Sequence, residues 1–326
     1  MNPDVVRSIE DLRARGVLSE SQAALPARVA RGEIVSIRAE LRAALYAGVL
    51  LVTTGAGLLV RQNLEAIGPL GVALGLGLAA AVALGWVARS APAFSWAEVP
   101  SPNLAFDYVL LLGVLLAAAD LAYVEVHFTP LGRAWPWHLL IVSLLTAACA
   151  FRYDSRVVFS LALGTFAAWR GVSVAYLEPT WWRGPEPAIR ANMIVCGAIF
   201  VAAGWILART NRKAHFEPVA AYLGWLLVLG ALASGTFDGI TDTSTLLAHA
   251  GALSLVGAIL AAWSLTRRRF VTFALGVVGA YVGVSGLVVH TVGYGSDVVV
   301  LAWFTLSAFG LLGALVAGHR SMRRAP

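Results

Sequence analysis

The chain has 326 residues, of which 59% are apolar and only 13% are charged, and its mean hydropathy is +0.77. Because the apolar fraction of soluble domains is about one half, this composition excludes an ordinary soluble protein and indicates an integral membrane protein. A formal net charge of +6 also occurs in nucleic-acid-binding proteins, but the positions of the charges favour membrane topology, so we expect no nucleic-acid partner.

The first forty residues are polar and of mixed charge, and they lack the pattern of a secretory signal peptide. Apolar residues repeat at helical spacing up to Leu12, and Gly16 can end that helix in a left-handed conformation. Ser19 and Gln22 form a capping box that would begin a second helix. We therefore predict a small cytoplasmic helical hairpin, residues 1–40, whose end extends into the first membrane span.

Ten apolar runs of spanning length follow, and each predicts a transmembrane helix because a span needs about 20 apolar residues. The fourth run is the shortest. The predicted fold class is therefore all-α, a polytopic transmembrane helical bundle of about ten spans, residues 41–317, followed by a basic tail, residues 318–326. The predicted spans are residues 41–60, 69–88, 106–125, 135–151, 157–177, 189–208, 218–236, 245–266, 271–292 and 297–317.

The basic residues predict the orientation of this bundle. With ten spans, nearly all of the 24 basic residues fall on the side of the N-terminus, and this side is then cytoplasmic, as are both termini. The exceptions are Arg61, Arg133, Arg170, Arg183 and Arg190. Tryptophan rings prefer the headgroup level, and Trp86, Trp96, Trp205 and Trp263 would mark the inner boundary, with Trp135, Trp137, Trp181 and Trp182 at the outer one.

Two pairs of glycines have the spacing of close helix contacts. Gly279 and Gly283 form a GxxxG pattern in the ninth predicted span, and Gly71 and Gly75 repeat it in the second. Small residues at this spacing let the backbones of two membrane helices approach each other. We expect both pairs to lie in helix–helix contacts.

Placing an ionisable residue inside the hydrocarbon region has a high free-energy cost, so such residues are candidates for function. Asp120 and Arg170 would both lie roughly 20 Å from the inner face, at 1.5 Å per residue, in spans that run in the same direction. We predict an ion pair between them. The pair could fix the register of the helices, or it could belong to a pathway through the membrane.

A set of polar residues would lie at that depth or further out. No spacing in this set places two ligands on one helix, so we predict no metal site. His249 and His290 could hold a haem only as axial ligands on consecutive helices, and no cofactor is predicted. Nor does any nucleophile motif support an enzyme. The set comprises Glu125, His127, His138, Asp238, Asp242, His249, His290 and Asp297.

The N-terminal part resembles a known family. Arg15-Gly-Val-Leu-Ser-Glu-Ser-Gln22 in the hairpin and Ala44-Leu-Tyr-Ala-Gly-Val-Leu-Leu-Val52 at the first span are similar to the bacterial family of predicted membrane proteins catalogued as domain of unknown function 2157. The similarity covers roughly residues 5–90. It implies a multi-pass protein of the bacterial inner membrane, and it implies no catalytic residues because the family has no established activity.

Three functions remain open. The first is a permease or channel-like protein for a small solute or a lipid-linked molecule, with Asp120, Arg170 and the outer histidines along its path. The second is a structural or accessory membrane protein that binds a cytoplasmic or membrane partner through its hairpin. The third is an outer-face membrane enzyme that uses Glu125 or an aspartate with a histidine as acid and base. Intramembrane charge favours the permease by a narrow margin.

Overall fold

The computed structural model describes residues 11–30, 38–62, 64–131, 134–171, 187–237, 242–292 and 297–324, and these residues form helices and turns without a strand. The chain divides into two compact units, Met1–Gly68 and Pro69–Pro326. The division falls inside helix α4 (Leu64–Ser90), where Gly68 has a φ of 74° and breaks the helical backbone.

The first unit contains the predicted capping box. The backbone N–H of Ser19 donates to Gln22 Oε1 at 3.0 Å, and the N–H of Gln22 donates to Ser19 Oγ at 3.3 Å. Gly16, at a φ of 71°, has the predicted left-handed conformation. Helix α2 (Glu20–Ala30) begins at this box, and α3 (Arg38–Gln62) runs continuously across residue 40. The start of the first hairpin helix and residues 31–37 lie outside the described residues.

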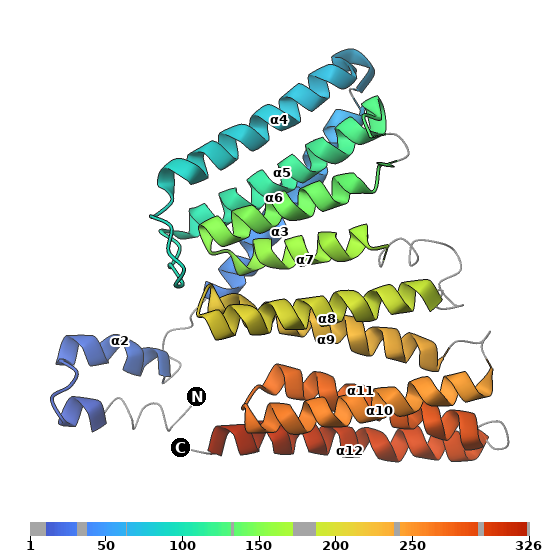
Figure 1. The fold of residues 1–326 in the computed structure, drawn as a ribbon. Coiled ribbons are helices and arrows are strands. Elements are labelled where there is room, and N and C mark those ends of the chain that lie inside the picture. Colours follow the sequence, from blue (N-terminus) through green and yellow to red (C-terminus); the bar gives the residue numbers. More distant parts are fainter. Residues whose placement is uncertain are drawn as a thin grey trace. The chain divides into compact units, whose positions relative to one another are not determined.

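The second unit is a series of antiparallel helices (Figure 1). Successive helices run in opposite directions, so the arginines near residues 89, 152, 209, 267 and 320 all lie at one end of the unit. We call this end the arginine-rich end. The helices after α4 are α5 (Leu104–Phe128), α6 (Trp137–Tyr153), α7 (Arg156–Trp169), α8 (Pro187–Thr210), the 3-10 helix η4 (Ala214–Phe216), α9 (Glu217–Thr236), α10 (Thr243–Thr266), α11 (Phe270–Val292) and α12 (Asp297–Arg324).

Among the residues that the structure describes, seven helical segments are long and apolar enough to cross a membrane, and the protein is therefore a multi-pass membrane protein. Shorter apolar helices occupy Ala44–Gly55, Trp137–Tyr153 and Arg156–Trp169, which correspond to the first, fourth and fifth predicted spans. The seven long segments are Gly68–Ser90, Leu104–Phe128, Pro187–Thr210, Ala214–Thr236, Thr243–Thr266, Phe270–Val292 and Val298–Met322.

The fifth predicted span, residues 157–177, is longer than the helix that the structure contains. Helix α7 ends at Trp169 because Gly171 adopts a left-handed φ of 83°. The N–H of Arg170 still donates to Phe166 O at 3.1 Å, and the N–H of Gly171 donates to Ala168 O at 2.9 Å. Glycine at this position is a common helix stop. Arg170 is consequently the first residue after the helix, and residues 172–177 lie outside the described residues.

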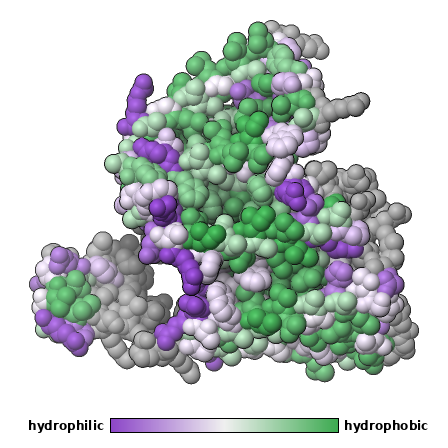
Figure 2. Space-filling model, in the orientation of Figure 1, coloured by the Kyte–Doolittle hydropathy of each residue, from purple (hydrophilic) through white to green (hydrophobic). Residues whose placement is uncertain are grey.

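The surface of the second unit has the apolar character of a lipid-facing surface (Figure 2). On α12, Leu301, Leu306 and Phe309 each expose about 70% of their area, with values of 70%, 72% and 71%. In water such an exposed apolar surface would promote aggregation, whereas lipid chains solvate it. The interior packs around separate clusters, one of which joins Phe106 and Leu110 of α5 to Phe159 and Phe216.

Glycines set the closest helix contacts of this unit. A Cβ at Gly197 of α8 would lie 2.5 Å from Gly224 O of α9. A Cβ at Gly283 would lie 2.5 Å from Ser254 N of α10, and one at Gly279 would lie 3.1 Å from Leu229 Cδ2 of α9. Gly279 and Gly283 therefore lie at helix contacts.

The other predicted glycine pair does not lie at a described contact. Gly71 and Gly75 face the exposed side of α4, and a Cβ at Gly75 would have no neighbour within 4 Å. The GxxxG spacing alone does not distinguish a helix face that packs against protein from one that faces lipid.

A buried ion pair lies at the arginine-rich end. Lys213 Nζ is 2.5 Å from Asp154 Oδ2, and the two side chains expose 0% and 5% of their area. Asp154 ends α6 and Lys213 precedes η4, both in left-handed conformations. The N–H of Lys213 also donates to Trp96 O at 2.7 Å, and its ammonium lies 4.9 Å from the centroid of the Phe94 ring. The pair thus joins three turns that are far apart in the sequence.

We expect Gly283→Ala to lower the free energy of unfolding by about 1–3 kcal/mol, because the added methyl group overlaps the backbone of α10. Gly75→Ala is the matched control: its methyl group has room, and alanine stabilises a helix by roughly 0.5–1 kcal/mol relative to glycine. Thermal unfolding of both variants in detergent measures the difference. Equal unfolding of Gly283→Ala and the wild type would contradict the close contact.

Removing one partner of the buried pair should lower the free energy of unfolding more than removing one partner of an exposed ion pair. Asp154→Asn keeps the shape and tolerates the left-handed backbone, so its expected loss of about 3–5 kcal/mol reports the uncompensated charge of Lys213. Arg156→Gln breaks the exposed pair with Glu98 (2.9 Å) and should cost less than about 1 kcal/mol. Denaturant unfolding in detergent compares the two, and similar small losses would show that Lys213 is not buried as described.

Candidate functional site: a groove with a cationic mouth

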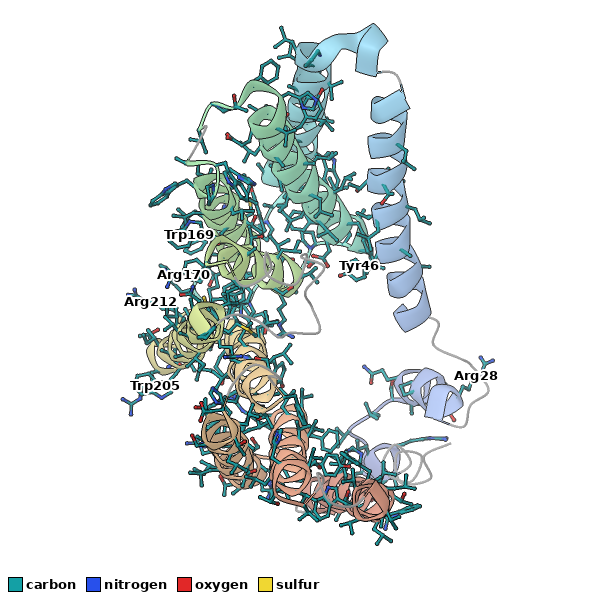
Figure 3. All side chains as sticks on the ribbon, turned by 90° about the vertical axis from the view of Figure 1, so that its right-hand side faces the viewer. Arg28, Tyr46, Trp169, Arg170, Trp205 and Arg212 are labelled. Carbon is teal, nitrogen blue, oxygen red and sulfur yellow. The ribbon has the colours of Figure 1, made fainter. Side chains whose placement is uncertain are left out.

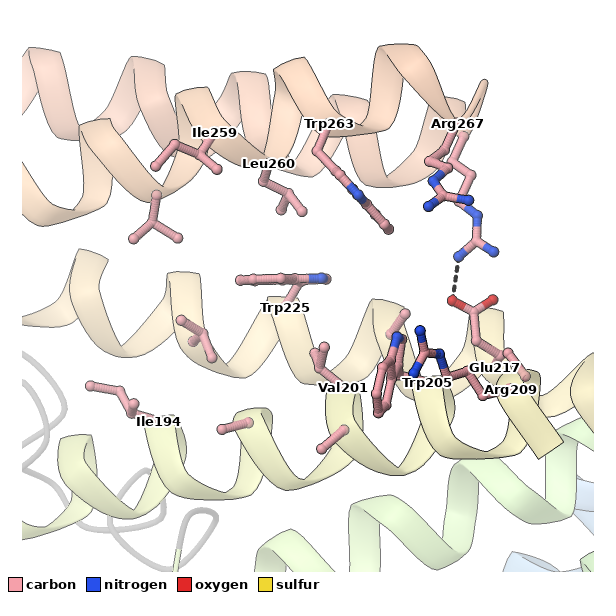
Figure 4. Close-up of a pocket in the computed structure, with 17 residues that line it drawn as sticks. Ile194, Val201, Trp205, Arg209, Glu217, Trp225, Ile259, Leu260, Trp263 and Arg267 are labelled. Atoms are coloured by element: carbon pink, nitrogen blue, oxygen red, sulfur yellow. Dashed lines mark hydrogen bonds and ion pairs between the residues drawn. The ribbon is translucent and has the colours of Figure 1, made fainter.

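A groove of about 1110 Å³ runs between α8 and α10, along α9. Its apolar part includes Ile194, Val201, Trp225, Val256 and Leu260. Figure 4 shows Trp225 between the two outer helices, with the charged residues gathered at one end. That end lies at the arginine-rich end of the unit, and we call it the mouth of the groove.

The lining follows from helical spacing. On α8, Ala198, Ala202, Trp205 and Arg209 contribute to the groove, and their intervals of four, three and four residues place them on one helix face. Alanines on this face leave room that longer side chains would fill. On α10 and the turn after it, the lining residues follow the i, i+3, i+4, i+7, i+11 pattern of one helix face: Val256, Ile259, Leu260, Trp263 and Arg267.

Three arginines and one glutamate surround the mouth: Arg209, Arg267, Arg269 and Glu217. Arg269 Nη1 donates a hydrogen bond to Glu217 Oε1, and this bond raises the pKa of Arg269. Neither Arg209 nor Arg267 forms an ion pair with a carboxylate among the described residues. With one of three positive charges neutralised by Glu217, two remain for a ligand.

Tryptophan rings support these arginines. The Arg209 guanidinium lies 4.6 Å from the centroid of the Trp205 ring, and the Arg267 guanidinium lies 5.9 Å from that of Trp263. Such cation–π contacts orient a guanidinium without neutralising its charge. Trp205 also points outward from α8 (Figure 3), and tryptophan prefers the level of the lipid headgroups. The mouth therefore has the composition of a headgroup-level site.

The groove continues from this level into the hydrocarbon region. Trp225 follows Glu217 by eight residues, which corresponds to about 12 Å along the helix. From Arg209 to Ile194 the α8 face extends by roughly 22 Å. One leaflet contributes about half of the 30 Å hydrocarbon core, so the groove is long enough for one lipid chain of a single leaflet.

The predicted ion pair between Asp120 and Arg170 is not formed between these two described residues. Arg170 Nη2 instead donates to Asn192 Oδ1 of α8 at 2.8 Å, and Arg170 lies beside Trp169 at the end of α7 (Figure 3). The physical reason is the early end of α7, since the residue after a helix stop turns toward the next segment rather than toward α5. Asp120 Oδ1 is buried and has no hydrogen-bond partner.

The polar residues that the sequence predicts on the outer side mostly make local bonds. Glu125 accepts the N–H of Leu131 at 3.2 Å, His127 Nδ1 is 3.2 Å from Tyr123 O, and His138 Nδ1 is 2.5 Å from Trp135 O. These contacts close the ends of helices and form no shared centre. The described residues contain no group of three or more histidine, cysteine, aspartate or glutamate side chains that could hold a metal ion.

Asp242 caps α10. It accepts the N–H of Thr245 at 3.1 Å and the hydroxyl of Thr245 at 2.8 Å, and hydrogen bonds from Ser244 and Thr245 lower the pKa of Asp242 to about 2. This carboxylate is therefore ionised at neutral pH and stabilises the start of the helix. Asp238 lies outside the described residues, and of Asp297 only the backbone is described, at the start of α12.

Two of the histidines approach the same end of α9. The ring of His249 packs so closely on Gly235 that a Cβ there would lie 2.2 Å from it, and His290 Nε2 donates to Thr236 O at 2.6 Å. His249 Nδ1 donates to Thr245 O of its own helix at 2.8 Å. Each ring thus donates one hydrogen bond to a backbone carbonyl. The immediate role of both rings is the packing of α10 and α11 on α9.

Sequence reasoning missed the groove, although a signal for it is present. Trp205 with Arg209, and Trp263 with Arg267, each stand four residues apart, the spacing at which two side chains meet on a helix. Two such pairs at the same predicted boundary could have indicated a cationic, aromatic site. No family model, curated protein or solved structure matches the chain, so the groove itself is the best guide to function.

Proposed function

We propose that this protein binds an anionic membrane lipid, or a molecule linked to such a lipid, in the groove and moves it across the membrane as a permease. The observation that carries the proposal is the combination of an apolar groove long enough for a lipid chain with two uncompensated arginines at its mouth. A phosphate headgroup matches this charge, and its chain matches the lining.

We infer a ten-span topology in a bacterial inner membrane, with both termini in the cytoplasm. The distribution of arginines supports this orientation. Helices α6 and α7, of 17 and 14 residues, are shorter than a bilayer core, but they pack on each other beside longer helices (Figure 1). Protein neighbours and local thinning of the bilayer can accommodate short spans. We also propose that the chain belongs to the family that its N-terminal part resembles, on the strength of the hairpin and first-span sequences.

A lipid-linked substrate fits the protein better than a small solute does. The groove lies between lipid-facing helices, whereas Asp120 and Arg170, which favoured a polar pathway, form no pair. An accessory role in which the lipid only stabilises the protein is the alternative, and transport assays distinguish it. The dispersed outer carboxylates and histidines give the enzyme hypothesis no specific support.

The double variant Arg209→Gln/Arg267→Gln should lose the preference of the purified protein for phosphatidylglycerol over phosphatidylcholine. Each arginine near an anionic surface contributes about 1 kcal/mol, so the expected loss in affinity is roughly thirtyfold. The shift of the unfolding temperature with added lipid measures it. Arg320→Gln, at the exposed end of α12, removes one charge outside the groove and should retain the preference. An unchanged preference in the double variant would contradict the proposed site.

Transport is tested in vesicles that contain a fluorescent phosphatidylglycerol and the reconstituted protein. A membrane-impermeant reductant should quench fluorophores of both leaflets with the wild type, but only those of the outer leaflet with the double variant. If the wild type prefers phosphatidylglycerol but does not exchange it between the leaflets, the result would support the accessory role and contradict the permease.

A further inference from the structure

Asp120 is a half-buried side chain whose carboxyl group has no partner among the described residues. Its Oδ1 is inaccessible and accepts no hydrogen bond, and none of the ion pairs among the described residues includes it. The carboxyl group lies against Gly77 of α4, where a Cβ would be 3.0 Å from Asp120 Oδ2. Glycine at this position gives the carboxyl group access to the surface of α4.

This carboxyl group lies within the hydrocarbon region. Asp120 precedes the last residue of α5, Phe128, by eight positions, or about 12 Å. From Leu104 it is separated by sixteen positions, or roughly 24 Å. An ionised carboxylate at such a depth costs several kcal/mol unless it is paired or hydrated. Proton binding removes that charge.

A stripe of titratable side chains leads from the outer end of α5 to Asp120. Tyr123 and His127 follow it at intervals of three and seven residues, so all three share one helix face. The Tyr123 hydroxyl is buried and has no hydrogen-bond partner. The exposed His127 ring stacks on the Tyr123 ring with 3.9 Å between centroids. The stripe therefore runs along one face of α5 from the helix end toward Asp120.

Other charged groups on the neighbouring helices do not compensate Asp120. Arg170 is bonded to Asn192, and Glu125 accepts the Leu131 N–H. The remaining titratable side chains that the structure describes on α4 to α7 lie toward the helix ends or in the inner half: Arg89, Asp107, Tyr108, His138, Cys149, Arg152, Tyr153 and Arg156.

We propose that Asp120 is a proton-binding site, which takes up and releases a proton through Tyr123 and His127 from the end of α5 that we assign to the outer face. The carboxylic acid is neutral when it holds the proton, and it becomes an uncompensated charge against α4 when the proton leaves. A permease can use such a change to couple proton movement to its conformational cycle. This inference goes beyond lipid binding and does not depend on the groove.

The test is modification by dicyclohexylcarbodiimide, an apolar reagent that adds to protonated carboxyl groups in membranes. In membranes that contain the full protein, peptide mass spectrometry should find the adduct on Asp120. Once the carboxyl group is mostly ionised, the yield should fall about tenfold for each further unit of pH. Asp107, whose Oδ1 accepts the Ser101 hydroxyl at 2.6 Å at the exposed start of α5, should react with a water-soluble carbodiimide instead.

Two variants complete the test. Asp120→Asn resembles the protonated acid, so it should unfold at the wild-type temperature and lose the adduct. Tyr123→Phe keeps the ring but removes the hydroxyl, and it should slow the return of reactivity after a drop in pH. The proposal is overturned if Asp120 of the folded wild type is unmodified, if its modification is independent of pH, or if Tyr123→Phe regains reactivity at the wild-type rate. Because none of these measurements involves the arginines of the groove, their result is independent of lipid binding.

Discussion

The buried contact between Lys213 and Asp154 is the interaction on which the arrangement of the arginine-rich end depends. Two charges taken out of water are stable only together, so the turn before α9 is held against the end of α6. Phe216 then stacks on Phe159 of α7 with 4.6 Å between ring centroids. Glu217 follows directly and begins α9. The mouth of the groove is therefore positioned by a contact that lies outside it.

The bilayer determines which parts of the groove can select a ligand. Lipid chains are as apolar as the groove, so a chain gains little from the hydrophobic effect when it leaves other lipids and enters the protein. Selection must come from the headgroup. In the function that we propose, Arg209 and Arg267 supply it, because tryptophan rings hold them while Glu217 neutralises only Arg269. In this proposal, the apolar part of the groove packs against the lipid chain, and the charge at the mouth selects the headgroup.

The positions of the helices could be predicted from the sequence, since hydrocarbon thickness imposes a length on every apolar run. All ten predicted runs coincide at least in part with helices, and the predicted capping box of Ser19 and Gln22 is confirmed. Contacts between helices could not be predicted in this way. The depths of Asp120 and Arg170 agreed, but depth says nothing about the direction in which a side chain leaves its helix, and Gly171 ended α7 early. Lys213 and Asp154 lie 59 residues apart in two turns, where hydrophobic periodicity carries no signal.

The central claim, that the groove holds an anionic lipid, is tested most directly by a phosphatidylglycerol with a photoactivatable group in its acyl chain. After illumination of the protein in vesicles, peptide mapping should find the adducts concentrated on the groove faces of α8, α9 and α10, with few of them when phosphatidylcholine carries the same group. Adducts that are spread evenly over the lipid-facing helices, α12 included, or that are equal for the two lipids, would contradict the claim.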